Sequence, residues 1–301
     1  MSFKPVKHTY GSHPRQFIEE FKYDPSIKDT VITIHGGGWV RYVEKPSDYL
    51  KLTENLDFKA NYFSLDYRLS ESHLLRDTDD ENPDKLYVKY PLHLLDILQG
   101  LKLIFDNFDI KKVHFIGHSV GALFALQLQD FAQLVPIGLS ELVKQKYITK
   151  DEEAKHLKFV KDFAEQWKKV ELVNVIYLSG VYDLPLGLRK TATAYPSDDP
   201  LNRYAFVLDA HVSEEQFTEA SVVTSTKIKE PFQTIKATGK HIILHSYTDQ
   251  YVVEYQPLAL LEYFFKLGKP IEFVLKDFGL HHDILKDEKA FKIISNFLNS
   301  D

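Results

Sequence analysis

One short segment, residues 115–122 (FIGHSVGA), constrains the fold of this chain more than any other. Val113–Ile116 is a short run of β-branched and aromatic residues, typical of a buried strand, and small or helix-forming residues follow Ser119. A turn between such a strand and such a helix holds the serine in a strained backbone conformation. Gly117 and Gly121 favour this turn because Cβ atoms beside the serine would crowd it. The segment therefore predicts a G-x-S-x-G nucleophile elbow with Ser119 as the nucleophile.

A glycine-rich loop follows a second predicted strand. Val31–Ile34 is β-branched and runs directly into the motif formed by His35, Gly36, Gly37, Gly38 and Trp39. Consecutive glycines are costly inside a strand or helix, but they suit a loop whose amides converge on one ligand atom. Together with the elbow, this loop is typical of the α/β-hydrolase fold, where it completes the oxyanion hole. We predict that the amides of Gly36, Gly37 and Val120 bind the oxyanion. His35 could be a base, but a role in holding the loop is favoured because it precedes the glycines.

The acid and the base should follow the nucleophile along the chain. The apolar strand at 240–247 leads to Asp249, and the strand at 271–275 leads to a glycine turn with two adjacent histidines. We predict Asp249 as the acid and His281 as the base, with His282 as the alternative base. The rival acids are better explained as turn or N-cap residues; they are Asp183, Asp277 and Asp283.

Together these motifs resemble the fungal kynurenine formamidases (arylformamidases), over about residues 29–298. The resemblance also includes residues 66–70 (DYRLS), 179–183 (SGVYD), 246–249 and 279–283, and its most specific element is Trp39. It implies an α/β-hydrolase that cleaves the linear amide C–N bond of N-formyl-L-kynurenine to give L-kynurenine and formate, in tryptophan degradation towards NAD. It also implies the triad Ser119, Asp249 and His281. No cofactor is expected.

Substrate recognition should fall on the leaving group, because a formyl group is too small to need a pocket. Trp39 could stack on the substrate ring, or it could be a core anchor that fixes the glycine loop. The amino-acid tail needs polar partners, for which the candidates are Arg68, Tyr182, Asp183, Arg189 and Lys190. For Arg68 an ion pair, for example with Asp66, is the favoured interpretation.

The order of the predicted elements favours one domain, residues 1–301. Strands and helices alternate as in a doubly wound α/β protein, which predicts a mostly parallel central sheet with helices on both faces. Additional strands or helices are expected at 61–65, 90–105, 217–225, 258–267 and 287–298. Segments near 136–170 and 185–220 are predicted to be insertions that form a small helical cap or lid. The polar stretch 70–89 is predicted to be a surface loop.

Composition excludes several function classes. The net charge of −6 gives no indication of nucleic-acid or anionic-membrane partners, and the absence of cysteine excludes disulfides and thiolate metal sites. The 13 histidines are scattered, so no metal is expected. The start of the chain is polar, and no apolar stretch of membrane-spanning length is evident, so a cytoplasmic protein is expected. The oligomeric state is open, and a homodimer is compatible with the sequence.

Two alternatives to the formamidase remain open. A broad-specificity carboxylesterase would share all the catalytic groups but bind an acyl chain. A non-enzymatic ligand-binding protein on the same scaffold would have little need of a serine, an acid and a late histidine together.

Overall fold

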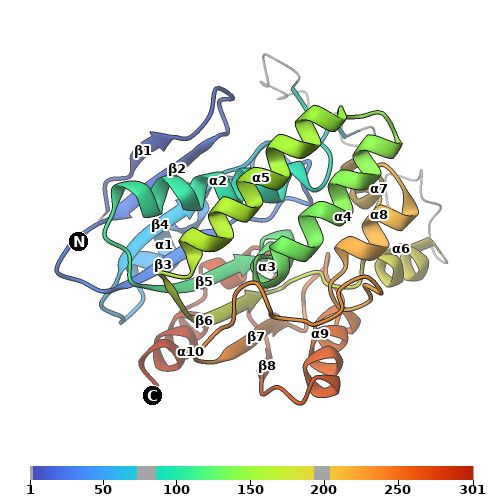
Figure 1. The fold of residues 1–301 in the computed structure, drawn as a ribbon. Helices are drawn as coiled ribbons and strands as arrows, with labels where there is room; N and C mark the ends of the chain where they lie inside the picture. Colours follow the sequence, from blue (N-terminus) through green and yellow to red (C-terminus); the bar gives the residue numbers. More distant parts are fainter. Residues whose placement is uncertain (1–2, 73–85, 193–203, 301) are drawn as a thin grey trace.

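The computed structural model describes residues 3–72, 86–192 and 204–300. Their centre is an eight-stranded sheet with the order β1-β2-β4-β3-β5-β6-β7-β8 (Figure 1). Its strands are β1 (Val6–Thr9), β2 (Phe17–Lys22), β3 (Asp29–Ile34), β4 (Asn61–Leu65), β5 (Lys112–His118), β6 (Glu171–Leu178), β7 (His241–Ser246) and β8 (Glu272–Lys276). Strand β2 pairs antiparallel with both β1 and β4, and all strands from β4 to β8 run parallel. The predicted fold class, a mostly parallel α/β sheet, is confirmed.

Successive side chains of the central strands enter two different cores, as the two-residue period of a strand requires. In β3, Ile32 and Ile34 join the larger core, and Val31 joins the smaller one. The larger core contains side chains of α2 (Leu92–Asn107), α3 (Val120–Gln127), α4 (Phe131–Lys144), α5 (Lys150–Trp167) and α9 (Tyr255–Lys266). The smaller core contains those of α1 (Leu50–Glu54) and α10 (Glu288–Asn299), so helices cover both faces of the sheet (Figure 1).

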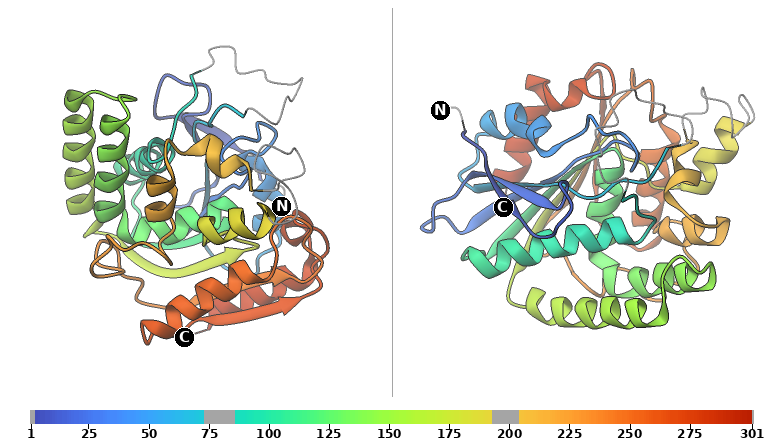
Figure 2. Two further views of the ribbon diagram at one scale, coloured as in Figure 1. Left: turned by 90° about the vertical axis from the view of Figure 1, so that its right-hand side faces the viewer. Right: turned by 90° about the horizontal axis from the view of Figure 1, so that it is seen from above.

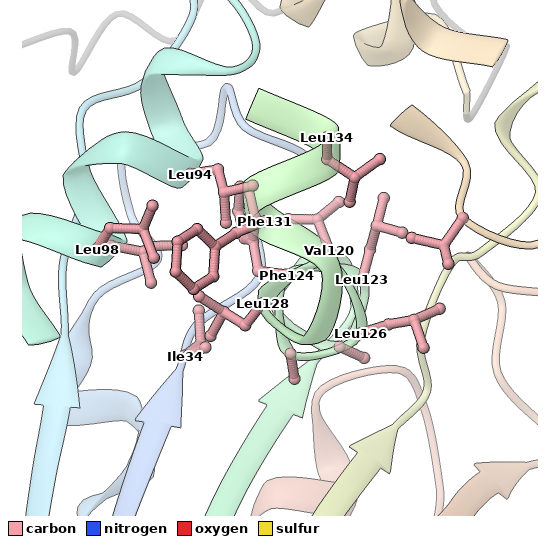
Figure 3. Packing of buried hydrophobic residues seen from close by; sticks show 14 of the residues in the cluster. Ile34, Leu94, Leu98, Val120, Leu123, Phe124, Leu126, Leu128, Phe131 and Leu134 are labelled. Carbon is pink, nitrogen blue, oxygen red and sulfur yellow. The ribbon is translucent and has the colours of Figure 1, made fainter. Parts of the chain in front are cut away.

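Helix α3 continues the elbow into the centre of the larger core. All eight of its residues are buried, and Figure 3 shows its Val120 and Phe124 in one apolar cluster with Phe131 of α4. A helix that is apolar on every side is typical of such a position. The helical run Val120–Lys144 is also long and apolar enough to cross a membrane, contrary to our expectation from sequence. Its most apolar window is 78% buried inside the protein, as a core helix would be.

Helices α4 and α5 lie side by side and correspond to most of the first predicted insertion (Figure 2). Phe163 and Trp167 of α5 pack against Phe105 of α2, and Trp167 also contacts Phe115 of β5. This hairpin therefore extends the core on one face of the sheet.

The second predicted insertion contains α6 (Leu184–Ala192), α7 (Phe206–Ala210) and α8 (Glu214–Ala220). The helix expected at 217–225 thus begins and ends earlier. Most of the predicted loop at 70–89, and residues 193–203 of this insertion, lie outside the described residues.

Candidate active site

Ser119 lies in a strained turn at the carboxyl end of β5. Its φ of 56° and ψ of −123° place a non-glycine residue in a sparsely populated region, and the side chain is nearly buried. The flanking glycines are required by contact distances: a Cβ atom on Gly117 would lie 2.2 Å from the backbone oxygen of Gly121. One on Gly121 would lie 2.0 Å from the backbone oxygen of Ile34. The elbow geometry expected from sequence is therefore present.

Asp249 and His281 meet at the same edge of the sheet, on the loops that follow β7 and β8. Nδ1 of His281 donates to Oδ2 of Asp249 over 2.7 Å, and both side chains are almost fully buried. A carboxylate can only accept, so this bond fixes the proton on Nδ1 and leaves Nε2 as the basic nitrogen. His281 and Ser119 line the same pocket. The hydroxyl of Ser119 has no hydrogen-bond partner among the described residues, and such bonds often tighten only when substrate binds.

The surroundings of Asp249 keep its carboxylate ionised. Burial alone would raise its pKa, but the bond from His281 opposes this effect. Oδ1 also accepts from the amides of Tyr251 and Val252, each at 2.8 Å. Together the hydrogen bonds outweigh burial and lower the pKa of Asp249 to about 2.

Two polar residues that the sequence analysis did not identify hold the backbone of His281. Oε1 of Gln250 accepts from its amide at 2.9 Å, and Nε2 of His118 donates to its carbonyl oxygen at 2.9 Å. Burial, followed by the nearby His281 and His282, lowers the pKa of His118 well below its usual value, so the ring is neutral. The position of His118 within the elbow motif was the available signal, because that residue ends β5 directly before Ser119.

The alternative base and the rival acids have other partners. Nε2 of His282 lies 3.4 Å from Oε1 of Glu44, and this ring is much more exposed than that of His281. The three rival carboxylates accept from backbone amides of their own turns, at 2.7–3.0 Å: Asp183 from Leu186, Asp277 from Gly279 and Asp283 from Leu280. The geometry thus favours His281 and Asp249, and the turn and N-cap interpretation of the other three.

The glycine loop after β3 has an unusual backbone. Gly37, Gly38 and Trp39 all have positive φ, at 94°, 56° and 63°. The amides of Gly36, Gly37 and Gly38 have no acceptor in the described part of the chain, and Gly37 and Gly38 line the pocket beside Ser119. Gly36 is not among the lining residues; a Cβ atom there would lie 2.8 Å from Cβ of Ser119. Of the predicted donors in this loop, Gly37 therefore lines the pocket and Gly36 does not, and Gly38 is a further candidate.

A buried network holds this loop from below. Asp66 accepts from Arg15 at 2.8 Å and contacts Nε2 of His35 at 3.0 Å. The ring of His35 stacks on Tyr67, whose hydroxyl donates to the backbone oxygen of Gly36 at 2.8 Å. Arg15 also donates to backbone oxygens further along the loop, at residues 42 and 44. This network supports the structural role expected for His35.

The pocket above Ser119 has a volume of about 270 Å³. Besides Ser119, His281 and His282, its lining consists of Gly37, Gly38, Val40, Arg41, Glu44, Ser72, Val181, Tyr204, Ala205, Phe206, Asp209, Tyr251 and Val252. No described residue of the first predicted insertion is among them, whereas the second insertion contributes four, from Tyr204 to Asp209. In the described ranges, no cluster of three or more histidine or acidic side chains could hold a metal ion.

The residues that the sequence suggested for substrate binding lie elsewhere. Trp39 is fully buried and packs edge-on against Phe124, which agrees with the core-anchor interpretation. Tyr182 is also fully buried and does not line the pocket. Arg68 forms an ion pair, but with Asp96 instead of Asp66, at 2.7 and 2.8 Å.

The remaining tail candidates, Asp183, Arg189 and Lys190, are also absent from the lining.

Comparisons with known proteins give relatives over nearly the whole chain. The chain is 27% identical to a kynurenine formamidase of Debaryomyces hansenii over 95% of its length and 97% of the relative's. It is 28% identical to that of Scheffersomyces stipitis, over 93% of this chain and 94% of the relative, and 23% identical to that of Saccharomyces cerevisiae, over 89% and 88%. No family model matches.

Among solved structures, esterase B of Lactobacillus rhamnosus superposes with a TM-score of 0.63 at 17% identity, covering 98% of this chain and 85% of that one. An arylesterase superposes with a TM-score of 0.58 at 15% identity, covering 94% and 79%. These structures establish the fold, and the sequence relatives establish the kinship. The chain is thus a homologue of the kynurenine formamidases, built on the α/β-hydrolase fold.

Proposed function

We propose that this protein is a serine hydrolase that deformylates N-formyl-L-kynurenine to L-kynurenine and formate. The observation that carries the proposal is that Ser119 shares a pocket with His281, whose Nδ1 is bonded to Asp249. The kinship with kynurenine formamidases supports the choice of substrate.

In the first half of the reaction, Nε2 of His281 takes the proton of Ser119 while the hydroxyl oxygen attacks the formyl carbon. Asp249 holds the imidazole and stabilises its cationic form. The oxyanion accepts hydrogen bonds from the amides of Gly37, Gly38 and Val120, each typically contributing about 3 kcal/mol to transition-state stabilisation. The amide of Val120 lies in the first turn of α3, where N–H groups have no partner within the helix.

In the second half, the C–N bond breaks and His281 donates its proton to the departing arylamine. An arylamine leaves more readily than an alkylamine because its ring delocalises the nitrogen lone pair. Water, deprotonated by His281, then attacks the formyl ester on Ser119 and releases formate. The small formyl group requires no acyl pocket, so the cavity is available for the aromatic leaving group. Phe206 and Tyr251 line that cavity and can pack against the substrate ring.

A substrate comparison tests the proposal. Values of kcat/KM for N-formyl-L-kynurenine, p-nitrophenyl acetate and p-nitrophenyl butyrate are measured on the wild type and on Ser119→Ala. We expect N-formyl-L-kynurenine to be preferred by more than about tenfold, and Ser119→Ala to lower its turnover at least about 10³-fold while the far-UV spectrum is unchanged.

Two outcomes contradict the proposal. Faster turnover of both esters than of the formamide would indicate a broad-specificity carboxylesterase. No turnover of any substrate, with no covalent labelling of Ser119 by a fluorophosphonate, would indicate a ligand-binding protein without catalytic activity.

A further inference from the structure

The pocket carries charged side chains that the deformylation steps do not use. Arg41 and Glu44 line it, three residues apart on the continuation of the glycine loop. The amide of Glu44 is bonded to the backbone oxygen of Arg41. The cation and the carboxylate are therefore carried by one short segment next to the proposed oxyanion hole.

Glu44 is a buried carboxylate with too few partners. Its exposed fraction is 7%, and its one ion pair among the described residues is the 3.4 Å contact with His282. An ionised carboxylate can accept about four hydrogen bonds, and burying it without partners is costly. Its presence in the pocket wall therefore indicates a cationic or hydrogen-bond-donating ligand.

Arg41 is the complementary group. Its side chain is half-buried and forms no hydrogen bond or ion pair with any residue that the structure describes, and its Nε is fully buried without an acceptor. A guanidinium presents a planar set of donors that suits a carboxylate. Both residues lie near His282: burial lowers the pKa of His282, Glu44 raises it, and Arg41 is among the groups that lower it further.

We propose that Glu44 binds the α-ammonium group of the substrate's amino-acid tail and that Arg41 binds its α-carboxylate. The inference rests on the proposed function, and it assigns the specificity for a zwitterionic leaving group to the loop that also supplies oxyanion donors. Asp209 is another carboxylate in the lining, but it already accepts from Ser72 at 3.2 Å. Glu44 is therefore the better partner for an ammonium group.

The test removes each charge from the enzyme and from the substrate in turn. Wild type, Glu44→Gln and Arg41→Met are assayed with three formamides. The first is N-formyl-L-kynurenine, and the second is its analogue without the α-amino group (the desamino analogue). The third is the analogue whose aryl ketone ends in a methyl group, so that it lacks both the amino group and the carboxylate (the methyl ketone). We expect Glu44→Gln to reduce the wild-type preference for N-formyl-L-kynurenine over the desamino analogue by about 10- to 100-fold. We expect Arg41→Met to reduce the preference for the desamino analogue over the methyl ketone by a similar factor.

Glu262→Gln and Arg189→Met are matched controls. Glu262 is exposed on α9 and pairs with Lys266, and Arg189 is exposed on α6 away from the pocket lining. Both should keep the wild-type preferences.

The possible failures are distinguishable. Wild-type preferences that persist in both pocket variants would overturn the tail assignment alone. The same would follow if each variant lost equal activity on all three formamides, since that pattern indicates a structural defect. A wild type that hydrolyses all three formamides equally would also overturn the tail assignment alone, whereas a wild type that hydrolyses none of them would overturn the proposed function together with this inference.

Discussion

Replacing Asp249 by asparagine should nearly abolish turnover while the protein still folds. The carboxylate accepts from Nδ1 of His281 and from the amides of Tyr251 and Val252. An asparagine side chain can keep the two amide bonds through its oxygen, but it then presents an NH₂ group to Nδ1. That contact favours the tautomer with the proton on Nε2, which cannot accept the proton of Ser119.

The expected loss in kcat is about 10³- to 10⁴-fold, the size seen when the acid of another serine hydrolase is neutralised in this way. The assay is kynurenine release at saturating N-formyl-L-kynurenine. Asp183→Asn is the matched control, because that carboxylate caps α6 through the amide of Leu186 and has no contact with His281 in the described structure. A loss below tenfold in Asp249→Asn, or an equal loss in Asp183→Asn, would show that Asp249 is not the catalytic acid.

The same variant has a second signature in the pH dependence of stability. The pKa of Asp249 is lowered from 3.8 to about 2 in the folded protein. A lowered carboxylate pKa stabilises the folded state above the unfolded pKa, and this stability is lost as the pH falls towards the folded pKa. A difference of about 1.8 units corresponds to roughly 2 kcal/mol, about half of which is lost by pH 3.

Urea unfolding between pH 6 and pH 3 measures this contribution of the Asp249 carboxylate to the free energy of unfolding. The free energy of unfolding of the wild type should fall relative to that of Asp249→Asn by about 1 kcal/mol over this range. Parallel pH profiles for the two proteins would contradict the bonding described for Asp249.

Three further substitutions test other parts of the structure. His281→Ala should lower kcat at least about 10³-fold, whereas His282→Ala should stay within about tenfold of the wild type; the reverse result would exchange the two assignments. Gly121→Ala should destabilise the fold by more than about 3 kcal/mol in urea, since its Cβ would overlap a backbone oxygen, and a change below about 1 kcal/mol would contradict the elbow geometry. Arg68→Met should cost about 3–5 kcal/mol because it leaves the buried Asp96 without its ion pair; a selective rise in KM at unchanged stability would instead indicate a role in substrate binding.

The sequence predicts the central strands well because each is buried on both faces. A strand of this kind is a short apolar run with turn residues at its ends, as in β3, β4 and β5, and that pattern is visible without any tertiary information. The antiparallel pair β1 and β2 was not predicted. Strand β1 has only four residues, all at least partly exposed, and its register depends on pairing with β2. Strand pairing of this kind is set by tertiary contacts that a local pattern does not contain.

Neighbouring polar residues in the sequence need not be ion-pair partners in the fold. Asp66 lies two residues from Arg68, yet it pairs with Arg15, more than 50 residues earlier, while Arg68 pairs with Asp96. The residues that line the pocket are likewise distributed from Gly37 to His282. Motifs identify the reactive groups because their backbone geometry requires particular residues, above all glycine. A binding group such as Glu44 needs only a charge at the right place, so no local pattern marks it.

The strained glycine loop connects these two kinds of residue. Three consecutive positive φ values persist only where the surrounding structure fixes them. Here Arg15 donates both to Asp66, under the start of the loop, and to backbone oxygens at residues 42 and 44. One guanidinium therefore holds the segment with the proposed oxyanion amides and the segment with Glu44 in a fixed relation. A reaction that must align a small formyl group while binding a charged tail several bonds away benefits from this coupling, because misplacing either end lowers the fraction of bound substrate in a reactive position.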